Sequence, residues 1–153
     1  MRMIFPGIRE RRAIDRSLSD FFHSYTAPRF RRAIGAISRF YDLRAPRVEW
    51  FEYLDWGKSG GRTFENGKIH LVHPENWKRG RKYNTERRWI QTVYHEMGHY
   101  VLWADAERKA DLFAYGFVRG VSASPMFGRL RGRPDRSFRR SRPHRRRRRS
   151  RSR

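Results

Sequence analysis

Two histidines four residues apart, with a glutamate directly after the first, are the residues of this sequence best suited to chemistry. They stand in the segment His95-Glu96-Met97-Gly98-His99. Side chains four apart on an α-helix lie on one face with their Cβ atoms about 5–6 Å apart. Both imidazoles can therefore bind one Zn²⁺ ion through bonds of about 2.0–2.1 Å. Glu96 would then lie beside the open coordination position, where a general base is needed to activate water.

A catalytic zinc ion needs a third protein ligand as well as that open position. The chain has no cysteine, and the next histidine after His99 is His144, inside an arginine-rich segment. The nearest suitable donor is Glu107, and Asp111 follows it on the same helix face. We expect Glu107 to bind the metal and Asp111 to accept a hydrogen bond from the second nitrogen of a ligand histidine, which fixes the tautomer and orientation of that ring.

This site requires a break between the two groups of ligands. In one continuous helix, His99 and Glu107 would lie about 12 Å apart along the axis, at 1.5 Å per residue, and could not bind the same ion. The sequence therefore predicts a helix, a tight turn near Trp103 and Ala104, and a second helix with Asp105 as its N-cap. An uninterrupted helix would exclude the site.

The pattern H-E-x-G-H followed by E-x-x-A-D-x-F-A resembles the gluzincin metallopeptidases and is most similar to their ImmA/IrrE-like group. The resemblance covers residues 46–120 and is strongest in the two helices. It implies that His95, His99 and Glu107 bind Zn²⁺, that Glu96 is the general base, and that Asp111 is hydrogen-bonded to a ligand histidine. It also implies hydrolysis of a peptide bond in a protein substrate, which in this group is often a repressor.

Further expectations follow from the same resemblance. In gluzincins an edge strand of the sheet binds the extended peptide substrate by backbone pairing, a role that falls on residues 69–72 here. Tyr115 and His70 are candidates for stabilising the oxyanion beside the metal, and an ordinary half-buried histidine is the alternative reading of His70. The spacer between His99 and Glu107 has seven residues, which is short for the group.

The chain before these helices is expected to supply two amphipathic helices and a small sheet. One helix is predicted over residues 8–23 and another after the break at Thr26-Ala27-Pro28. Their apolar stripes need a core, so we expect the pair to pack on the catalytic helices. The alternative is that their arginine-rich faces contact nucleic acid or another anionic surface.

The sheet is predicted from two segments of strand-forming residues. Residues 48–54 and 68–73 are rich in aromatic and β-branched side chains, and the turn signal Asn66-Gly67 precedes the second. We expect a small antiparallel sheet packed on helices, hence an α+β fold. Residues 76–84 are expected to form a basic loop before a helix that Asn84 or Thr85 caps.

Charge separates the C-terminal region from the rest. The formal net charge is +22, and residues 129–153 hold fourteen arginines and one aspartate, leaving +9 for the remainder. We expect three regions: an N-terminal helical segment (1–45), a zincin-like core (46–121) and a disordered basic tail (122–153). The tail is expected to bind nucleic-acid phosphates without sequence specificity.

The remaining expectations concern location and overall function. No apolar segment approaches the ~18 residues of a membrane span, and no signal peptide is recognisable, so a cytoplasmic protein without membrane contact is expected. The candidate zinc site and the family resemblance together predict a zinc metallopeptidase that acts on a protein substrate. Two alternatives stay open: a non-catalytic nucleic-acid-binding or packaging protein, viral or otherwise, with a structural or vestigial metal site, and an enzyme that hydrolyses a non-peptide amide.

Overall fold

The computed structural model describes residues 2–80 and 85–121. The predicted tail over residues 122–153, with its nucleic-acid-binding segment 129–153, lies outside the described residues. All described residues belong to one compact unit, so the predicted regions 1–45 and 46–121 are both parts of it. In chain order the elements are α1 (Ile8–Ser24), α2 (Ala27–Phe40), β1 (Val48–Phe51), the 3₁₀ turn η1 (Asp55–Gly57), β2 (Gly61–Thr63), β3 (Ile69–Val72), α3 (Pro74–Arg79), α4 (Glu86–Leu102) and α5 (Glu107–Val118).

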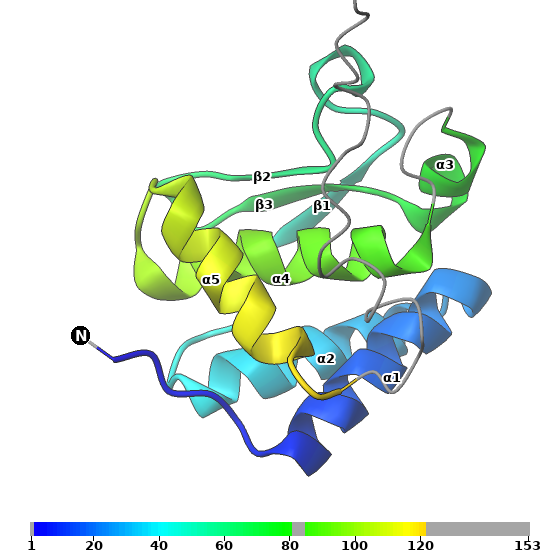
Figure 1. The fold of residues 1–153 in the computed structure, drawn as a ribbon. Helices are drawn as coiled ribbons and strands as arrows, with labels where there is room; N and C mark the ends of the chain where they lie inside the picture. The colour runs from blue at the N-terminus through cyan, green and yellow to red at the C-terminus, as the bar shows by residue number, and fades with distance from the viewer. Residues whose placement is uncertain (1, 81–84, 122–153) are drawn as a thin grey trace, which may run out of the picture. The chain divides into compact units, whose positions relative to one another are not determined.

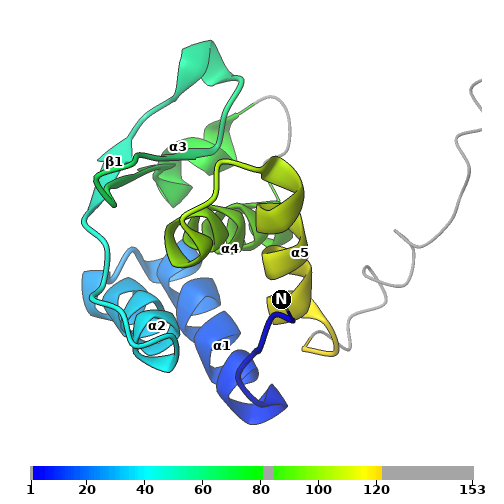
Figure 2. The ribbon, with the colours of Figure 1, turned by 90° about the vertical axis from the view of Figure 1, so that its left-hand side faces the viewer.

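The predicted α+β class is confirmed, with α4 as the central element. The sheet covers one side of α4, α1 and α2 cover the opposite side, and α5 crosses α4 near its C-terminal end (Figure 1). The view turned by 90° shows α4 in the same central position, with α5 beside it (Figure 2). Within the described residues, none of the helices is long and apolar enough to cross a membrane.

The sheet is mixed, not wholly antiparallel as the sequence predicted. Its strand order is β1-β3-β2, with β2 antiparallel to β3 and β1 parallel to it. The β2–β3 hairpin forms at the expected turn, where Gly67 has a φ of +84° and the Lys68 amide donates to the Asn66 side chain over 3.0 Å. After β1 the chain forms β2 at the opposite edge of the sheet. It then turns back, so that β3 lies between the other two strands, antiparallel to β2 and parallel to β1. Residues 69–72 are therefore the central strand, and their expected role as an edge strand is wrong.

Residues 74–79 form a short helix, so the loop predicted over residues 76–84 is wrong at its start; residues 81–84 lie outside the described residues. Pro74 occupies its first turn, and the Nδ1 atom of His73 accepts a hydrogen bond from the Glu75 amide over 3.1 Å as the N-cap. Gly80 follows as the C-cap. Proline at the start and glycine after the end are both helix-boundary signals, so the sequence contained the information for α3.

The prediction that α1 and α2 pack on the metal-site helix is confirmed. The guanidinium group of Arg87 on α4 makes three contacts of 3.0 Å with the Asp15 carboxylate on α1, and Asp15 is buried. The rings of Phe21 and Phe22 lie 5.8 Å and 5.7 Å from that of Trp89. The apolar stripe predicted for the second helix is buried, with Phe30, Ala33, Ile34 and Ile37 all in the core.

Candidate metal centre

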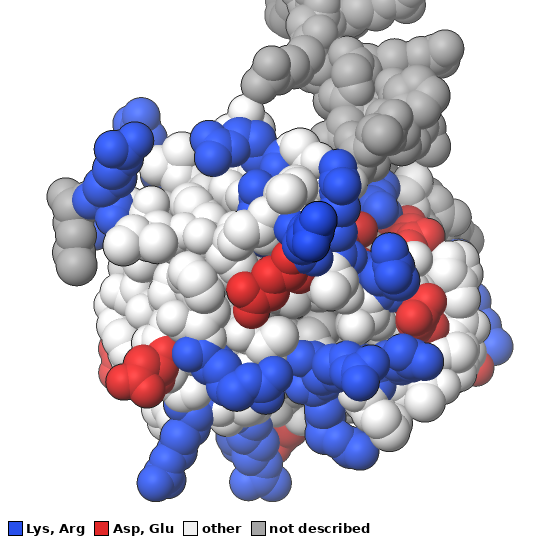
Figure 3. Space-filling view, turned by 90° about the horizontal axis from the view of Figure 1, so that it is seen from below, with Lys and Arg blue, Asp and Glu red and all other residues white. Residues whose placement is uncertain are grey.

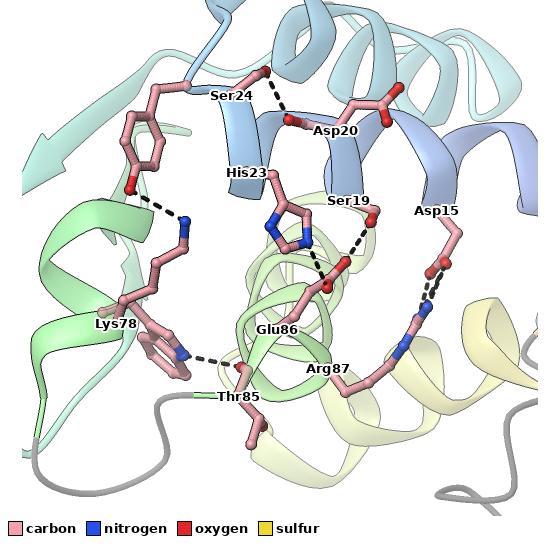
Figure 4. A network of polar contacts seen from close by, with 11 residues as sticks. Asp15, Ser19, Asp20, His23, Ser24, Lys78, Thr85, Glu86 and Arg87 are labelled. Atoms are coloured by element: carbon pink, nitrogen blue, oxygen red, sulfur yellow. Dashed lines mark hydrogen bonds and ion pairs between the residues drawn. The ribbon is translucent and has the colours of Figure 1, made fainter.

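α4 holds the two histidines on a largely buried helix. Its N-cap is Thr85, one of the two residues predicted for this position, and the Thr85 hydroxyl oxygen accepts a hydrogen bond from the Arg88 amide. The first-turn residue Glu86 is hydrogen-bonded to Ser19 and lies 2.9 Å from Nε2 of His23, so α1 fixes the start of the helix (Figure 4). The apolar side chains that bury α4 are Trp89, Ile90, Val93, Tyr94 and Met97.

The predicted helix–turn–helix is confirmed. α4 ends at Leu102, Trp103 adopts the left-handed conformation with φ 48° and ψ 41°, and α5 begins at Glu107. The N-cap is Ala106, without a side-chain hydrogen bond, so the assignment of Asp105 as N-cap is wrong. The turn reverses the chain within four residues, which is what allows Glu107 to approach the histidines.

A glycine in α4 permits the close approach of α5. A Cβ atom at Gly98 would lie 3.0 Å from the Cβ atom of Phe113 and 3.1 Å from the Cα atom of Ala110. These separations are shorter than ordinary van der Waals contact, so a larger residue would push the helices apart. The glycine inside the H-E-x-G-H pattern thus has a packing reason that is separate from metal chemistry.

The three predicted metal ligands come together. The Nε2 atom of His95 lies 2.9 Å from Oε2 of Glu107, and that of His99 lies 3.3 Å from Oε1. The two Nε2 atoms are 3.2 Å apart. One ligand atom from each residue falls within 4.8 Å of the others, which is the spacing of donors around a single ion.

The opposite nitrogen of each ring is fixed by a hydrogen bond. Nδ1 of His95 lies 2.8 Å from Oδ1 of Asp111, as predicted, and Nδ1 of His99 lies 2.6 Å from the carbonyl oxygen of Ala104. Because a carbonyl can only accept, Nδ1 of His99 carries the proton and Nε2 of the neutral ring carries a lone pair. The carboxylate of Asp111 favours the same tautomer for His95.

This arrangement fits a metal cation. Two lone-pair nitrogens and a carboxylate point at one small volume, where they repel one another unless a cation lies between them. Two histidines and one glutamate are also a donor set that catalytic zinc sites use, with the fourth position left open. The residues present therefore fit zinc by donor type, tautomer and number.

Glu96 is buried against the edge strand β2. Its side chain is 5% exposed, and its Oε2 atom accepts a hydrogen bond of 2.6 Å from the Thr63 hydroxyl. Burial raises the pKa of the Glu96 carboxyl, while the Thr63 hydrogen bond acts in the opposite direction. A Cβ atom at Gly61 would lie 2.6 Å from Cγ of Glu96, so only glycine lets this strand come so close.

A cleft of about 610 Å³ opens beside these residues. Glu96, His99 and Glu107 line it, together with residues of β2 and the exposed ring of Trp103. A reactive group bound in this cleft would lie beside His99, Glu107 and the carboxylate of Glu96 at once. The lining also includes Leu54, Asp55, Ser59, Phe64, Glu65, Tyr100, Ala104 and Asp105.

The two candidates for stabilising the oxyanion differ in position. His70 lines the cleft. Its Nε2 atom is buried and lies 3.0 Å from Oε2 of Glu49, but the two atoms do not meet the geometry of a hydrogen bond. Tyr115 is exposed on α5, eight residues after Glu107 and therefore about 12 Å further along the helix axis. Stabilisation of the oxyanion remains a prediction for both residues. Of the two, His70 lines the cleft and Tyr115 does not.

Sequence reasoning missed three contributors to the site: the Thr63 hydroxyl, the Ala104 carbonyl and the close approach of Gly61. No local pattern marks Thr63 or Gly61, because their partners are more than thirty residues away in the sequence. The Ala104 carbonyl could have been found, since it lies in the predicted turn only five residues after His99. Comparison of the chain with protein-family profiles, curated proteins and solved structures found no match.

Proposed function

We propose that the protein is a zinc metallopeptidase in which His95, His99 and Glu107 bind Zn²⁺ and Glu96 is the general base. One observation carries the proposal. The Nε2 atoms of two histidines and the carboxylate of Glu107 converge within 4.8 Å, while both Nδ1 atoms lie against hydrogen-bond acceptors. This geometry favours a cation and gives the two helices a shared function.

The protein residues have distinct tasks in hydrolysis. When bound, the zinc ion would supply an acidified water and polarise the substrate carbonyl. Glu96 accepts the proton from the attacking water and transfers it to the leaving amine. Burial moves the pKa of Glu96 upward, toward the neutral range where a general base works best. The Thr63 hydroxyl holds one carboxylate oxygen, leaving the other for proton transfer.

The edge strand that lines the cleft supports a peptide as the substrate. β2 is an edge strand of the sheet, and its residues line the cleft beside Glu96. An extended peptide could pair with this edge and place a carbonyl near the ligands. In this proposal the substrate is a protein, such as a repressor or another nucleic-acid-bound protein. Binding of residues 129–153 to nucleic acid would raise the local concentration of enzyme around it.

The proposal is tested with Glu96→Gln. Zinc-loaded wild-type protein and the variant are incubated with a proteome-derived peptide library, and new termini are identified by mass spectrometry. We expect the variant to retain zinc and to lose cleavage by at least about 10²-fold, the lower end of the usual contribution of a general base. Glu75→Gln, an exposed substitution on α3, is the matched control and should cleave normally.

A second function is favoured by the arginine content of residues 129–153. The protein could bind or package nucleic acid, with the metal site serving only to join α4 and α5. In that case Glu96→Gln changes nothing, and zinc removal lowers stability without affecting any reaction.

An enzyme that hydrolyses a non-peptide amide would use the same residues as the peptidase. Acetylated or formylated small amides are the substrates that test for this activity.

A further inference from the structure

The outward faces of α1 and α2 carry a set of exposed arginines. Arg9, Arg12 and Arg16 follow an i, i+3, i+7 spacing and so share one face of α1. Arg32 and Arg39 are seven residues apart and share one face of α2. All five side chains are exposed, and we refer to them together as the arginine face.

Few negative charges balance this face. α1 has three acidic residues: Asp15 is buried in its ion pair with Arg87, Asp20 lies 4.0 Å from Arg29, and Glu10 is exposed next to Arg9 in the sequence. α2 has no acidic residue. The five guanidinium groups make no hydrogen bond or ion pair with any other residue in the described part of the chain. Seen from the side of α1 and α2, Lys and Arg side chains extend across the surface (Figure 3).

The composition of the face favours a nucleic-acid backbone over insertion into a lipid bilayer. A helix that binds a membrane inserts an apolar face between the lipids, but the apolar sides of α1 and α2 are already buried in the core, with Leu18 and Ile37 at 0% exposure. Among the exposed positions that remain on the two helices, arginine is the most frequent residue. Its planar fork of donors binds phosphate oxygens in pairs, and several such groups on one face match the repeated charges of a nucleic-acid backbone.

We propose that α1 and α2 form a binding face for the phosphate backbone of duplex nucleic acid, independent of residues 129–153. Binding is insensitive to sequence, because none of these side chains is placed by the fold to read base edges. The metal cleft is lined by residues from the segments 54–70 and 96–107, and none comes from α1 or α2. Nucleic acid on the arginine face therefore leaves the cleft open to a protein substrate.

The test uses full-length protein in which the fourteen arginines of residues 129–153 are replaced by glutamine. Its binding to a fluorescein-labelled 30-base-pair DNA duplex is measured by anisotropy at several NaCl concentrations. We expect binding whose log K falls with log[NaCl] with a slope of about −4.5, if all five arginines bind phosphates. Adding Arg→Gln at positions 9, 12, 16, 32 and 39 should abolish measurable binding.

A matched control separates position from net charge. The control variant has glutamine in place of five exposed basic residues elsewhere: Arg44, Arg47, Lys58, Arg108 and Lys109. It loses the same amount of charge and should keep most of its affinity for the DNA duplex. An equal loss of DNA affinity in the two five-fold variants would overturn the proposal. Absence of DNA binding by the protein with only the fourteen arginines of residues 129–153 replaced would also overturn it. Vesicles containing phosphatidylserine are the third probe. Binding to vesicles but not to DNA would also overturn it. None of these outcomes depends on zinc or peptide cleavage.

Discussion

At the residue scale, the hydrogen bond between Asp111 and His95 is the most direct test of how the ligands are oriented. Asp111→Ala removes the acceptor for Nδ1, so the ring loses its fixed tautomer and orientation. We expect zinc affinity to fall by about 10–100-fold, as is usual when such an outer partner is lost. Competition with a fluorescent zinc chelator measures the change. Leu112→Ala, which changes the exposed neighbour of Asp111 on α5, is the control, and an equal effect there would contradict the role of Asp111.

Thr63 positions the carboxylate of Glu96, and its removal has a predicted pH signature. The Thr63 hydrogen bond lowers the pKa of Glu96, so in Thr63→Val that pKa rises further above its ordinary value. A general base works only when deprotonated, so the acid side of the pH–rate profile should move to higher pH. We expect peptide cleavage at neutral pH to fall about tenfold or more, with zinc content unchanged.

Thr63→Ser keeps the hydroxyl and should restore both the rate and the profile. A slower Thr63→Val enzyme with an unshifted profile would mean that Thr63 acts on the structure of β2 and not on the carboxylate.

At the scale of elements, Gly98 sets the distance between α4 and α5. Gly98→Val places methyl groups against Phe113 and Ala110, where even one Cβ is crowded. We expect a loss of about 1–3 kcal/mol in the free energy of unfolding, together with weaker zinc binding, because Glu107 moves with α5. Urea denaturation and chelator competition measure the two effects.

Gly35→Ala in α2 is the matched control, because its nearest neighbour is the flexible end of Arg39, 3.2 Å away. Removing this helix glycine should stabilise the protein by up to about 1 kcal/mol. If Gly98→Val were destabilised but bound zinc as tightly as wild type, the packing of α4 on α5 would not determine the position of Glu107, and this prediction would be contradicted.

The N-cap of α3 gives stability a pH dependence. Burial lowers the pKa of His73, and its neutral Nδ1 accepts the Glu75 amide. Because the folded pKa lies below the unfolded value, the native state binds fewer protons, and stability falls as the pH drops below about 6.5. Thermal unfolding between pH 7.5 and 5 should show a steeper loss in wild type than in His73→Asn, whose amide accepts a hydrogen bond at every pH.

At the scale of the whole molecule, what sequence could predict follows the range of the interactions involved. The spacing of His95, His99, Glu107 and Asp111 predicted two helices joined by a turn, because these relations act within about sixteen residues. The mixed sheet could not be predicted this way, since strand direction depends on where β1 enters relative to β2 and β3. Thr63 was missed for the same reason, as only the folded sheet brings it to Glu96.

The metal content of the protein tests the central claim most directly. Elemental analysis is performed on purified wild type, His95→Ala and Glu107→Ala, with circular dichroism confirming that each is folded. Binding of one ion by three converging donors predicts about one zinc per wild-type chain, none in His95→Ala and a reduced amount in Glu107→Ala. Three folded proteins that all lack zinc, or all hold it equally, would contradict the assignment of His95, His99 and Glu107 as the metal site.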